Sequence, residues 1–510
     1  MDEDLFSEEG LSRVIVAHDP EVKGYPTAAP FDPGQSYPEY PFPQDELSRE
    51  NRAYGLVREA LRLLHPEGFG SPDWNPLGEV IKPGDAVVIK PNLVDDSQWQ
   101  RGKITHPAVI RPIIDYAYKA CGPTGRIIVA EGPWAMGVFE RIVEITQLEQ
   151  MVGHLAGQHG LPAVLENLNK ATKETTPLID LGEASEFYGV DRTWYDAHGK
   201  ELRFDGDPGV GSYRIAPTVL QADVVINVPK VKVHCSAGVT LAMKNMVGII
   251  PCWDGPYQDR ALKDCPHTSS LDRQEGKRGE YAENDTIWRS IADLNKILLY
   301  ADRGGRLQSS RQRRSVTVVD GIIAGEESQF NPIPYPLSSI IIGFDPVAVD
   351  AVTARAMGFD HRRIKSIANA AQTTRFALGS AHPADVKVIL SGGERINALY
   401  DKVLTPELHV YSWRGYIEAT DFAFPEILGY GYAATAGELS VRARDDSGVA
   451  YIRLTYRRGG KPRMKDLKLV EGDKTDGEWR TRLLLGRGIE APTLIAADEL
   501  YNLGRWGIKL

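Results

Sequence analysis

Cysteine is scarce in this chain. Only Cys121, Cys235, Cys252 and Cys265 occur among 510 residues, and no two of them form a C-x-x-C pair. Four cysteines are too few for a disulfide scaffold, and iron–sulfur sites typically draw on closely spaced cysteines. We therefore expect no iron–sulfur cluster in this protein.

Long apolar runs and an excess of positive charge are absent as well. No stretch reaches the roughly eighteen apolar residues of a membrane span, so we expect no such span. The first residues, MDEDLFSEEG, lack the basic and apolar regions of an export signal. As written, the sequence predicts a cytoplasmic chain; export with an already removed signal is the open alternative. The net charge of −10 gives no global attraction for nucleic acid.

Several common catalytic motifs are missing too. No G-x-G-x-x-G follows the first strong strand, and neither a P-loop nor a G-x-S-x-G segment occurs. The sequence also lacks H-x-x-x-H and H-E-x-x-H, two common zinc-binding spacings. Nucleotide-fold, P-loop and serine-hydrolase functions therefore have no support from motifs.

Hydrophobic patterning predicts a large α/β domain. Apolar segments at 86–89, 126–133 and 223–234 alternate with helical patterns, as in parallel strands that are buried on both faces. We predict the α/β fold class, with a mostly parallel sheet flanked by helices in a core domain at 81–430. Residues 1–80 are expected to form a strand, a proline- and tyrosine-rich strap and a helix, all packed on that core.

Two further segments differ from this pattern. From 437 to 510 apolar and polar residues alternate with a period of two between short turns, which predicts a small all-β sandwich domain. Its strand spacing resembles immunoglobulin-like or fibronectin-like modules. Residues 252–284 form a polar excursion that is long for a simple connection, and we predict a functional lid there.

Polar side chains follow several of the predicted strands, at the point where each strand ends. In open parallel sheets, ligands bind outside the carboxyl ends of the strands, so we expect these groups to share one cleft. The alternative is that strand ends are polar because they meet water. The set comprises Lys90, Asn92, Glu131, Lys230, Lys232, His234, Asp320 and Asp345.

Lysines are concentrated in the segment from 227 to 245. Lys230 and Lys232 lie on one side of an extended chain, and Lys244 with Asn245 follows after a glycine. Such a cluster suits a carboxylate or phosphate group, and a lysine crowded by other cations could act as a base or nucleophile. Alternatively, Lys232 is a solvated edge residue and Lys230 pairs with Glu131 or Asp320.

We assign roles to these residues as hypotheses. Lys230, Asp320, Glu131 and His106 are the catalytic candidates, and Lys90, Asn92, Lys232, Lys244 and Asn245 are the substrate-binding candidates.

A divalent metal is a further possibility, with His234 and Asp345 as ligands. Each residue also has a structural alternative. A lone histidine is more often hydrogen-bonded within the fold, and an aspartate before Pro346 is ordinarily a helix cap. Likewise, His106 could simply begin a helix that is capped by Thr105 and stopped by Gly122.

The core resembles a known family. The segments VVIKPNLV, THPAVIRPIID, ADVVINVPKVKVHCSAGVTLAMKNMVGIIP, VTVVDGIIAG and IIIGFDPVAVDAVTARAMGFD match, in order, domain of unknown function family 362, over roughly Val87 to Asp360. Members occur in bacteria and archaea, sometimes fused to ferredoxin-like iron–sulfur modules. This sequence has no cysteine-rich module, which argues against a role in electron transfer.

The residues and the resemblance together favour an enzyme that acts on a small anionic metabolite carrying a carboxylate or phosphate. The alternative is a non-catalytic binding or assembly protein whose C-terminal sandwich contacts a protein partner or a second copy of the chain.

Overall fold

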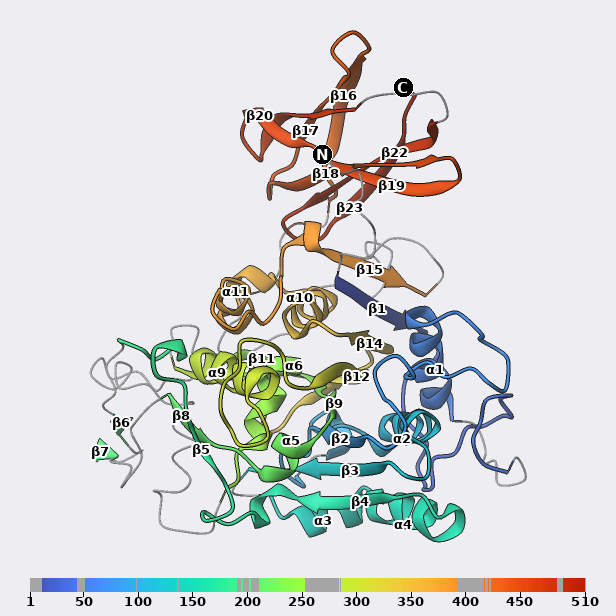
Figure 1. Ribbon diagram of the computed structural model, residues 1–510, viewed down its shortest axis with the longest axis vertical. Coiled ribbons are helices and arrows are strands. Elements are labelled where there is room, and N and C mark those ends of the chain that lie inside the picture. The colour runs from blue at the N-terminus through green and yellow to red at the C-terminus, as the bar shows by residue number, and fades with distance from the viewer. Residues whose placement is uncertain are drawn as a thin grey trace.

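An α/β body carries a β-sandwich at one end in the computed structural model of the chain (Figure 1). The structure describes residues 12–43, 51–97, 99–134, 137–189, 194–195, 201–202, 211–252, 284, 286–391, 417, 421, 423–483 and 489–509. The predicted fold class, a mostly parallel sheet flanked by helices with an all-β sandwich at the C-terminus, is confirmed.

The body is built on one large sheet, which has eleven strands among the described residues. Its main path runs in the order β15-β1-β14-β12-β9-β2-β3-β4. Every pairing along this path is parallel except the two made by β14, which runs antiparallel to β1 and to β12. The strands are β1 (Ser12–His18), β2 (Ala86–Pro91), β3 (Arg126–Glu131), β4 (Ala163–Asn167), β9 (Val224–Val228), β10 (Lys230–His234), β11 (Gly238–Thr240), β12 (Arg314–Glu326), β13 (Ile333–Tyr335), β14 (Ser339–Gly343) and β15 (Val386–Leu390).

Helices cover both faces of this sheet because alternate strand residues point to opposite sides. Val87 and Ile89 pack in the core beneath one helical layer, whereas Val88 packs beneath the other. The first layer contains α1 (Arg52–Leu64), α2 (Pro107–Cys121), α3 (Phe139–Ile145) and α4 (Leu148–His159); the second contains α5 (Pro217–Gln221), α6 (Ala242–Asn245), α9 (Ile287–Tyr300), α10 (Pro346–Ala356) and α11 (Lys365–Ala370).

Pro229 divides the strand predicted at 223–234 into β9 and β10. Before the proline, β9 pairs with β2 on one side and β12 on the other. After it, β10 continues along β12 but pairs with β11 instead of β2. The sheet therefore forks where β2 ends, and the candidate site lies at this fork.

The N-terminal segment is part of the body. Strand β1 lies inside the sheet between β15 and β14, and the strap that follows it buries Phe31, Tyr37 and Phe42 in the core. The strap also carries Tyr25 to the candidate site, as described below.

Two antiparallel four-stranded sheets form the C-terminal sandwich. One has the order β16-β17-β21-β20 and the other the order β19-β18-β22-β23. Strand β16 pairs with β17, so pairing in the sandwich begins before residue 437. The sandwich strands are β16 (Glu426–Ala433), β17 (Glu438–Arg444), β18 (Val449–Arg458), β19 (Lys461–Asp466), β20 (Lys468–Gly472), β21 (Asp476–Arg482), β22 (Ile489–Asp498) and β23 (Leu503–Gly507).

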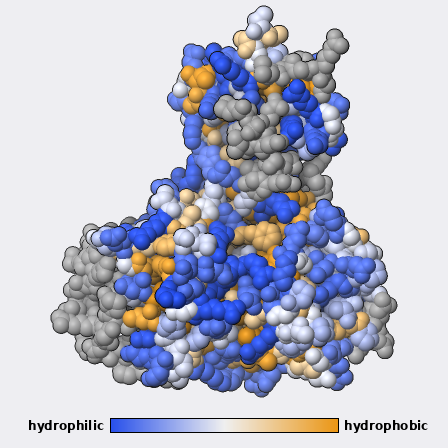
Figure 2. Space-filling model, in the orientation of Figure 1, coloured by the Kyte–Doolittle hydropathy of each residue, from blue (hydrophilic) through white to orange (hydrophobic). Residues whose placement is uncertain are grey.

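Two small antiparallel two-stranded sheets are formed by β5 (Leu178–Asp180) with β8 (Ser212–Arg214) and by β6 (Trp194–Tyr195) with β7 (Glu201–Leu202). Hydrogen bonds join the sandwich to the body, including one of 2.6 Å from the Arg355 guanidinium to Asn502 Oδ1. The face seen in Figure 2 is largely hydrophilic with smaller hydrophobic patches. No helix in the described ranges has both the length and the apolar character needed to cross a membrane.

Candidate functional site

A chain of buried amides and an ion pair lies where β2 ends. Lys90 Nζ is 2.9 Å from Glu131 Oε2 and 3.3 Å from Asn245 Oδ1. Asn92 Nδ2 donates to the same Asn245 oxygen at 3.1 Å. Strands β2 and β3 and helix α6 thus bring Lys90, Asn92 and Glu131, three members of the set predicted for one cleft, together with the substrate-binding candidate Asn245. Burial lowers the pKa of Lys90, while Glu131 partly opposes this shift.

A second buried ion pair joins β10 to β12. Lys230 Nζ lies 3.0 Å from Asp320 Oδ2, and both side chains are almost fully buried. Tyr25 links the two, because its hydroxyl donates to Asp320 Oδ1 at 2.6 Å and lies 2.5 Å from Lys230 Nζ. Desolvation by burial raises the pKa of Tyr25 well above its ordinary value, and the Asp320 carboxylate raises it further. The sequence left open whether Lys230 pairs with Glu131 or Asp320; its partner is Asp320.

His106 lies against this pair and begins α2. Its Nδ1 accepts a hydrogen bond of 3.1 Å from the Ala108 amide, and its own amide donates to Asp320 Oδ2 at 3.0 Å. The expectation that Thr105 caps this helix was wrong, because the Thr105 hydroxyl donates instead to the Val228 carbonyl at 2.7 Å. Burial, with Lys230 nearby, lowers the pKa of His106 well below its ordinary value, so the ring is neutral near pH 7.

Lys232 is also buried and forms no ion pair among the described residues, although the Asp95 and Glu131 carboxylates lie near enough to raise its pKa slightly against the effect of burial. Its Nζ donates to the Lys103 carbonyl at 2.7 Å and to Asn92 Oδ1 at 3.2 Å. Burial lowers its pKa well below the ordinary value, and neighbouring Lys244 lowers it further. The side chain is only 3% exposed, so the alternative of a solvated edge residue does not describe it.

Lys244 completes the cationic group from α6. It is half-buried, and within the described ranges its ammonium makes neither a hydrogen bond nor an ion pair. Desolvation lowers its pKa to about 8, against a smaller opposing effect of Cys235. Lys244 is therefore mostly protonated at neutral pH.

Lys103 is part of this neighbourhood, and the sequence analysis missed it. Its Nζ lies 2.8 Å from Asp95 Oδ2 and donates to Ser97 Oγ at 2.6 Å. The loop that carries it crosses β12 closely: a Cβ on Gly102 would lie 2.5 Å from the Ala324 carbonyl oxygen. In the sequence, the only indication of this crossing is Gly102 itself, because glycine allows two backbones to approach closely. The fold is needed to show that the neighbouring backbone is that of β12.

Within the described ranges, two polar atoms at this site are buried without a hydrogen-bond partner: Glu131 Oε1 and Thr240 Oγ1. Thr240 lies directly opposite Lys232 in the β10–β11 pair, so their side chains share one face. Gly248 packs against the Lys90–Glu131 pair, where a Cβ would lie 2.6 Å from Lys90 Nζ. Together these features leave unused hydrogen-bonding capacity beside the lysines.

Asp345 is not brought to this group. Because β14 runs antiparallel to β12, the end of β14 lies beside Thr317, toward the start of β12, and not beside Asp320. The Asp345 carboxylate accepts hydrogen bonds from Val347 and Ala348 at the start of α10, which fits its alternative role as a helix cap. The expectation that Asp345 shares the edge with Asp320 was therefore wrong.

His234 lies at the end of β10, on the same face as Lys232. Its Nδ1 accepts hydrogen bonds from the amides of Ser236 and Ala237 at 3.1 and 3.3 Å. Among the described residues, one group of three potential ligand side chains is close enough to share an ion, with ligand atoms within 4.8 Å of one another: Asp421, Asp445 and Asp498. Asp445 and Asp498 belong to the sandwich and Asp421 precedes its first strand, so the group includes neither of the predicted metal ligands.

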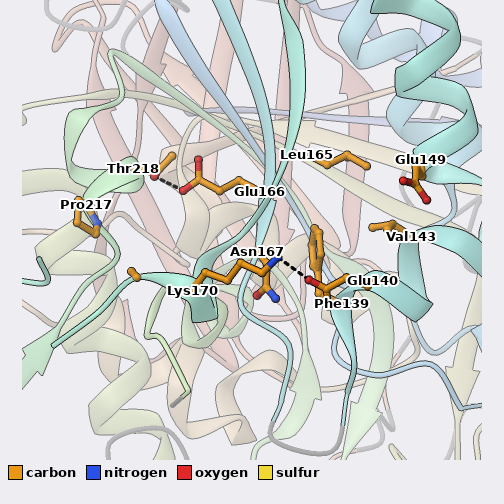
Figure 3. A pocket seen from close by; sticks show the side chains of 11 residues that line it. Phe139, Glu140, Val143, Glu149, Leu165, Glu166, Asn167, Lys170, Pro217 and Thr218 are labelled. Carbon is orange, nitrogen blue, oxygen red and sulfur yellow. Dashed lines mark hydrogen bonds and ion pairs between the residues drawn. The ribbon is translucent and has the colours of Figure 1, made fainter. Parts of the chain in front are cut away.

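A hollow of about 560 Å³ opens at the β4 edge of the sheet (Figure 3). Glu140, Glu149 and Glu166 line it together with one cation, Lys170, which pairs with Glu140 at 2.7 Å. Its charge is therefore predominantly negative, which is unfavourable for an anionic ligand. The lid predicted at 252–284 falls almost entirely outside the described residues.

Comparison with known proteins identifies a distant relative. The chain is 25% identical over 204 residues to the thylakoid-associated protein sll1697 of Synechocystis sp., a match that covers 40% of this chain. The chain spans about half of that relative, 49% of its length.

Two solved structures were also matched. The first, an endo-beta-1,4-mannanase double mutant of Cellulomonas fimi, is 11% identical with a TM-score of 0.19, covering 98% of this chain and 94% of that one. The second, an engineered protein, is 12% identical with a TM-score of 0.17, covering 100% and 95%. Neither score supports a structural relationship.

The model of one family matches residues 87–355, more than half of the chain. This range contains the forked strands, both buried ion pairs and the two lysines without carboxylate partners. The chain belongs to the family described as Domain of unknown function (DUF362).

Proposed function

We propose that the chain is an enzyme that acts on a small anionic metabolite, bound at the fork of the sheet by Lys244 beside the buried Lys232. One observation carries this proposal: the lysines at the site outnumber the carboxylates that pair with them. Lys90, Lys230 and Lys103 each have a carboxylate partner, whereas Lys232 and Lys244 have none among the described residues. Buried groups of this kind are costly unless they are paired, so a function in ligand binding explains why they are there.

A carboxylate or phosphate is the ligand that fits. It would accept hydrogen bonds from the Lys244 ammonium, while the Thr240 hydroxyl, which has no partner in the part of the chain that the structure describes, offers a further donor. The three paired lysines hold the surrounding backbone in place. Glu131 and Asp320 remain candidates for proton transfer under this proposal.

We expect Lys244→Met to weaken acetate binding about tenfold or more, because a hydrogen bond to a charged group contributes about 1.5–3 kcal/mol. Titration calorimetry on the full chain measures this. In the wild-type protein the affinity should fall as the pH rises through about 8, where Lys244 loses its proton. The Lys244→Met variant should show no such fall.

The matched control is Lys170→Met in the acidic hollow, which should leave acetate affinity unchanged. The free energy of unfolding provides a second control, because it should rise with pH over a range in which acetate affinity falls. Because the pKa of Lys244 is about 8 when folded and about 10.5 when unfolded, the unfolded chain binds more protons between these values. The free energy of unfolding of the unliganded protein should therefore gain from this group as pH rises through that window. Equal acetate affinity in all three proteins would refute the proposal.

We also propose a second function, self-assembly through an immunoglobulin-like C-terminal sandwich. It is favoured by Leu428 and Tyr430, which are exposed on β16, an edge strand, because unpaired strand edges readily pair with another chain. Light scattering should give a dimer mass that Leu428→Lys with Tyr430→Lys reduces to that of a monomer. Val470→Lys, on the opposite edge strand β20, should leave the dimer intact. A wild-type monomer would contradict this assignment.

A further inference from the structure

The hydrogen bonds of Lys232 are those of a neutral amine. Its Nζ donates two bonds, to the Lys103 carbonyl and Asn92 Oδ1, and has no third partner among the described residues. A neutral amine has two N–H groups and one lone pair, so this geometry satisfies both N–H groups and leaves the lone pair without a donor among the described residues. An ammonium ion would leave one charged N–H buried without an acceptor, which is costly.

The orientation of the Asn92 amide is fixed by a relay of amides. Asn227 Nδ2 donates to the Ala242 carbonyl at 2.8 Å, so its oxygen must face Asn245, whose Nδ2 donates to it at 2.8 Å. The Asn245 oxygen then accepts from Asn92 Nδ2 at 3.1 Å. Asn92 consequently turns its oxygen, an acceptor only, toward Lys232. The relay thus specifies an acceptor beside Lys232, which fits an amine donating two hydrogen bonds.

Two further polar groups, the Thr240 hydroxyl and the Lys244 ammonium, lie near the Lys232 amine. Thr240 lies opposite Lys232 in register, where side chains on one face lie roughly 4.5–5.5 Å apart at Cβ, and its hydroxyl has no hydrogen-bond partner among the residues described. Lys244 is close enough to affect the titration of Lys232 and is itself half-buried, so it can meet a ligand that arrives from solvent.

We propose that Lys232 is a nucleophile that forms an imine with the carbonyl carbon of a small 2-oxo acid whose carboxylate is held by Lys244. This inference rests on the anion site proposed above and names its substrate class. The Lys232 lone pair attacks the carbonyl carbon, a C=N bond replaces the C=O bond, and the oxygen leaves as water with both protons of the amine. The Thr240 hydroxyl and the Lys244 ammonium are placed to pass protons to that oxygen.

Reductive trapping tests the proposal. The full chain is incubated with pyruvate and cyanoborohydride, which reduces an imine to a stable secondary amine, and the modified lysine is located by peptide mass spectrometry. We expect modification of Lys232 at least tenfold above that of Lys90 and Lys230, two buried lysines of the same protein that are paired with carboxylates. Lys244→Met should reduce the trapping, and excess acetate should compete with it.

Lys232→Met, which removes the amine without adding a charge, should retain the fold, as checked by circular dichroism, and abolish trapping at this position; acetate competition in the wild-type protein tests the same point without a substitution. If acetate binds in a Lys244-dependent way but pyruvate leaves Lys232 unmodified, the nucleophile is refuted and the anion site stands. If acetate does not bind either, the proposed function itself fails. Modification spread evenly over exposed lysines would also overturn the inference.

Discussion

Asp320→Ala is expected to lower the free energy of unfolding by about 3–5 kcal/mol, the typical cost of removing one partner of a buried ion pair. Asp320 accepts from Lys230, from Tyr25 and from the His106 amide, and is itself fully buried. Its removal leaves the Lys230 ammonium in the core without a counter-charge. Urea denaturation monitored by circular dichroism measures the loss.

The informative control is the double variant Asp320→Ala with Lys230→Met. Because the second change removes the unpaired charge, the double variant should be more stable than Asp320→Ala alone. If the two are equally unstable, the loss comes from the cavity and from Tyr25 rather than from the buried charge. A stability close to wild type in the single variant would show that Lys230 readily becomes neutral in the core.

Gly102→Ala is expected to cost roughly 2–5 kcal/mol and to impair acetate binding. The residue has φ of +79°, a left-handed conformation that costs a residue with a Cβ roughly 1–2 kcal/mol. The new Cβ would also lie 2.5 Å from the Ala324 carbonyl oxygen, and overpacking of this kind costs about 1–3 kcal/mol. The loop must shift, and with it the Lys103 carbonyl that accepts from Lys232.

Gly70→Ala separates the cost of the left-handed backbone conformation from the cost of the close contact with β12. Gly70 has φ of +83°, but nothing lies within 4 Å of its added Cβ, so only the conformational cost applies. Denaturation midpoints of the two variants should differ by the contribution of the close crossing, and acetate affinity should change in Gly102→Ala alone. Equal losses of stability would mean that β12 yields to the added methyl group.

The sequence predicted much of the site because parallel strands place their carboxyl ends at one edge. Lys90, Asn92, Glu131, Lys230 and Asp320 follow continuous apolar runs. The structure links Lys90, Asn92 and Glu131 through Asn245 and pairs Lys230 with Asp320. Strand direction, by contrast, leaves no trace in the spacing of apolar residues. The run before Asp345 reads like the others, yet β14 is antiparallel, which puts Asp345 beside Thr317.

Contacts between segments far apart in the chain could not be predicted from the sequence. Tyr25 comes from a strap almost 300 residues before Asp320, and nothing in its local pattern indicates that its hydroxyl bridges a buried ion pair. Lys103 and Asp95 lie in a polar loop after β2 that reads as ordinary surface. The division of one predicted strand at Pro229 could have been predicted from the sequence, because proline interrupts a ladder of hydrogen bonds.

In strand β10, polar side chains at the candidate site alternate with apolar side chains that pack in the core. Lys230, Lys232 and His234 face the fork, while Val231 and Val233 between them are fully buried in the opposite core. Deleting or inserting a single residue here would exchange the two sets, burying cations among aliphatic side chains. Over evolutionary time this stretch can therefore change its chemistry by substitution, one position after another, but cannot tolerate a change in length.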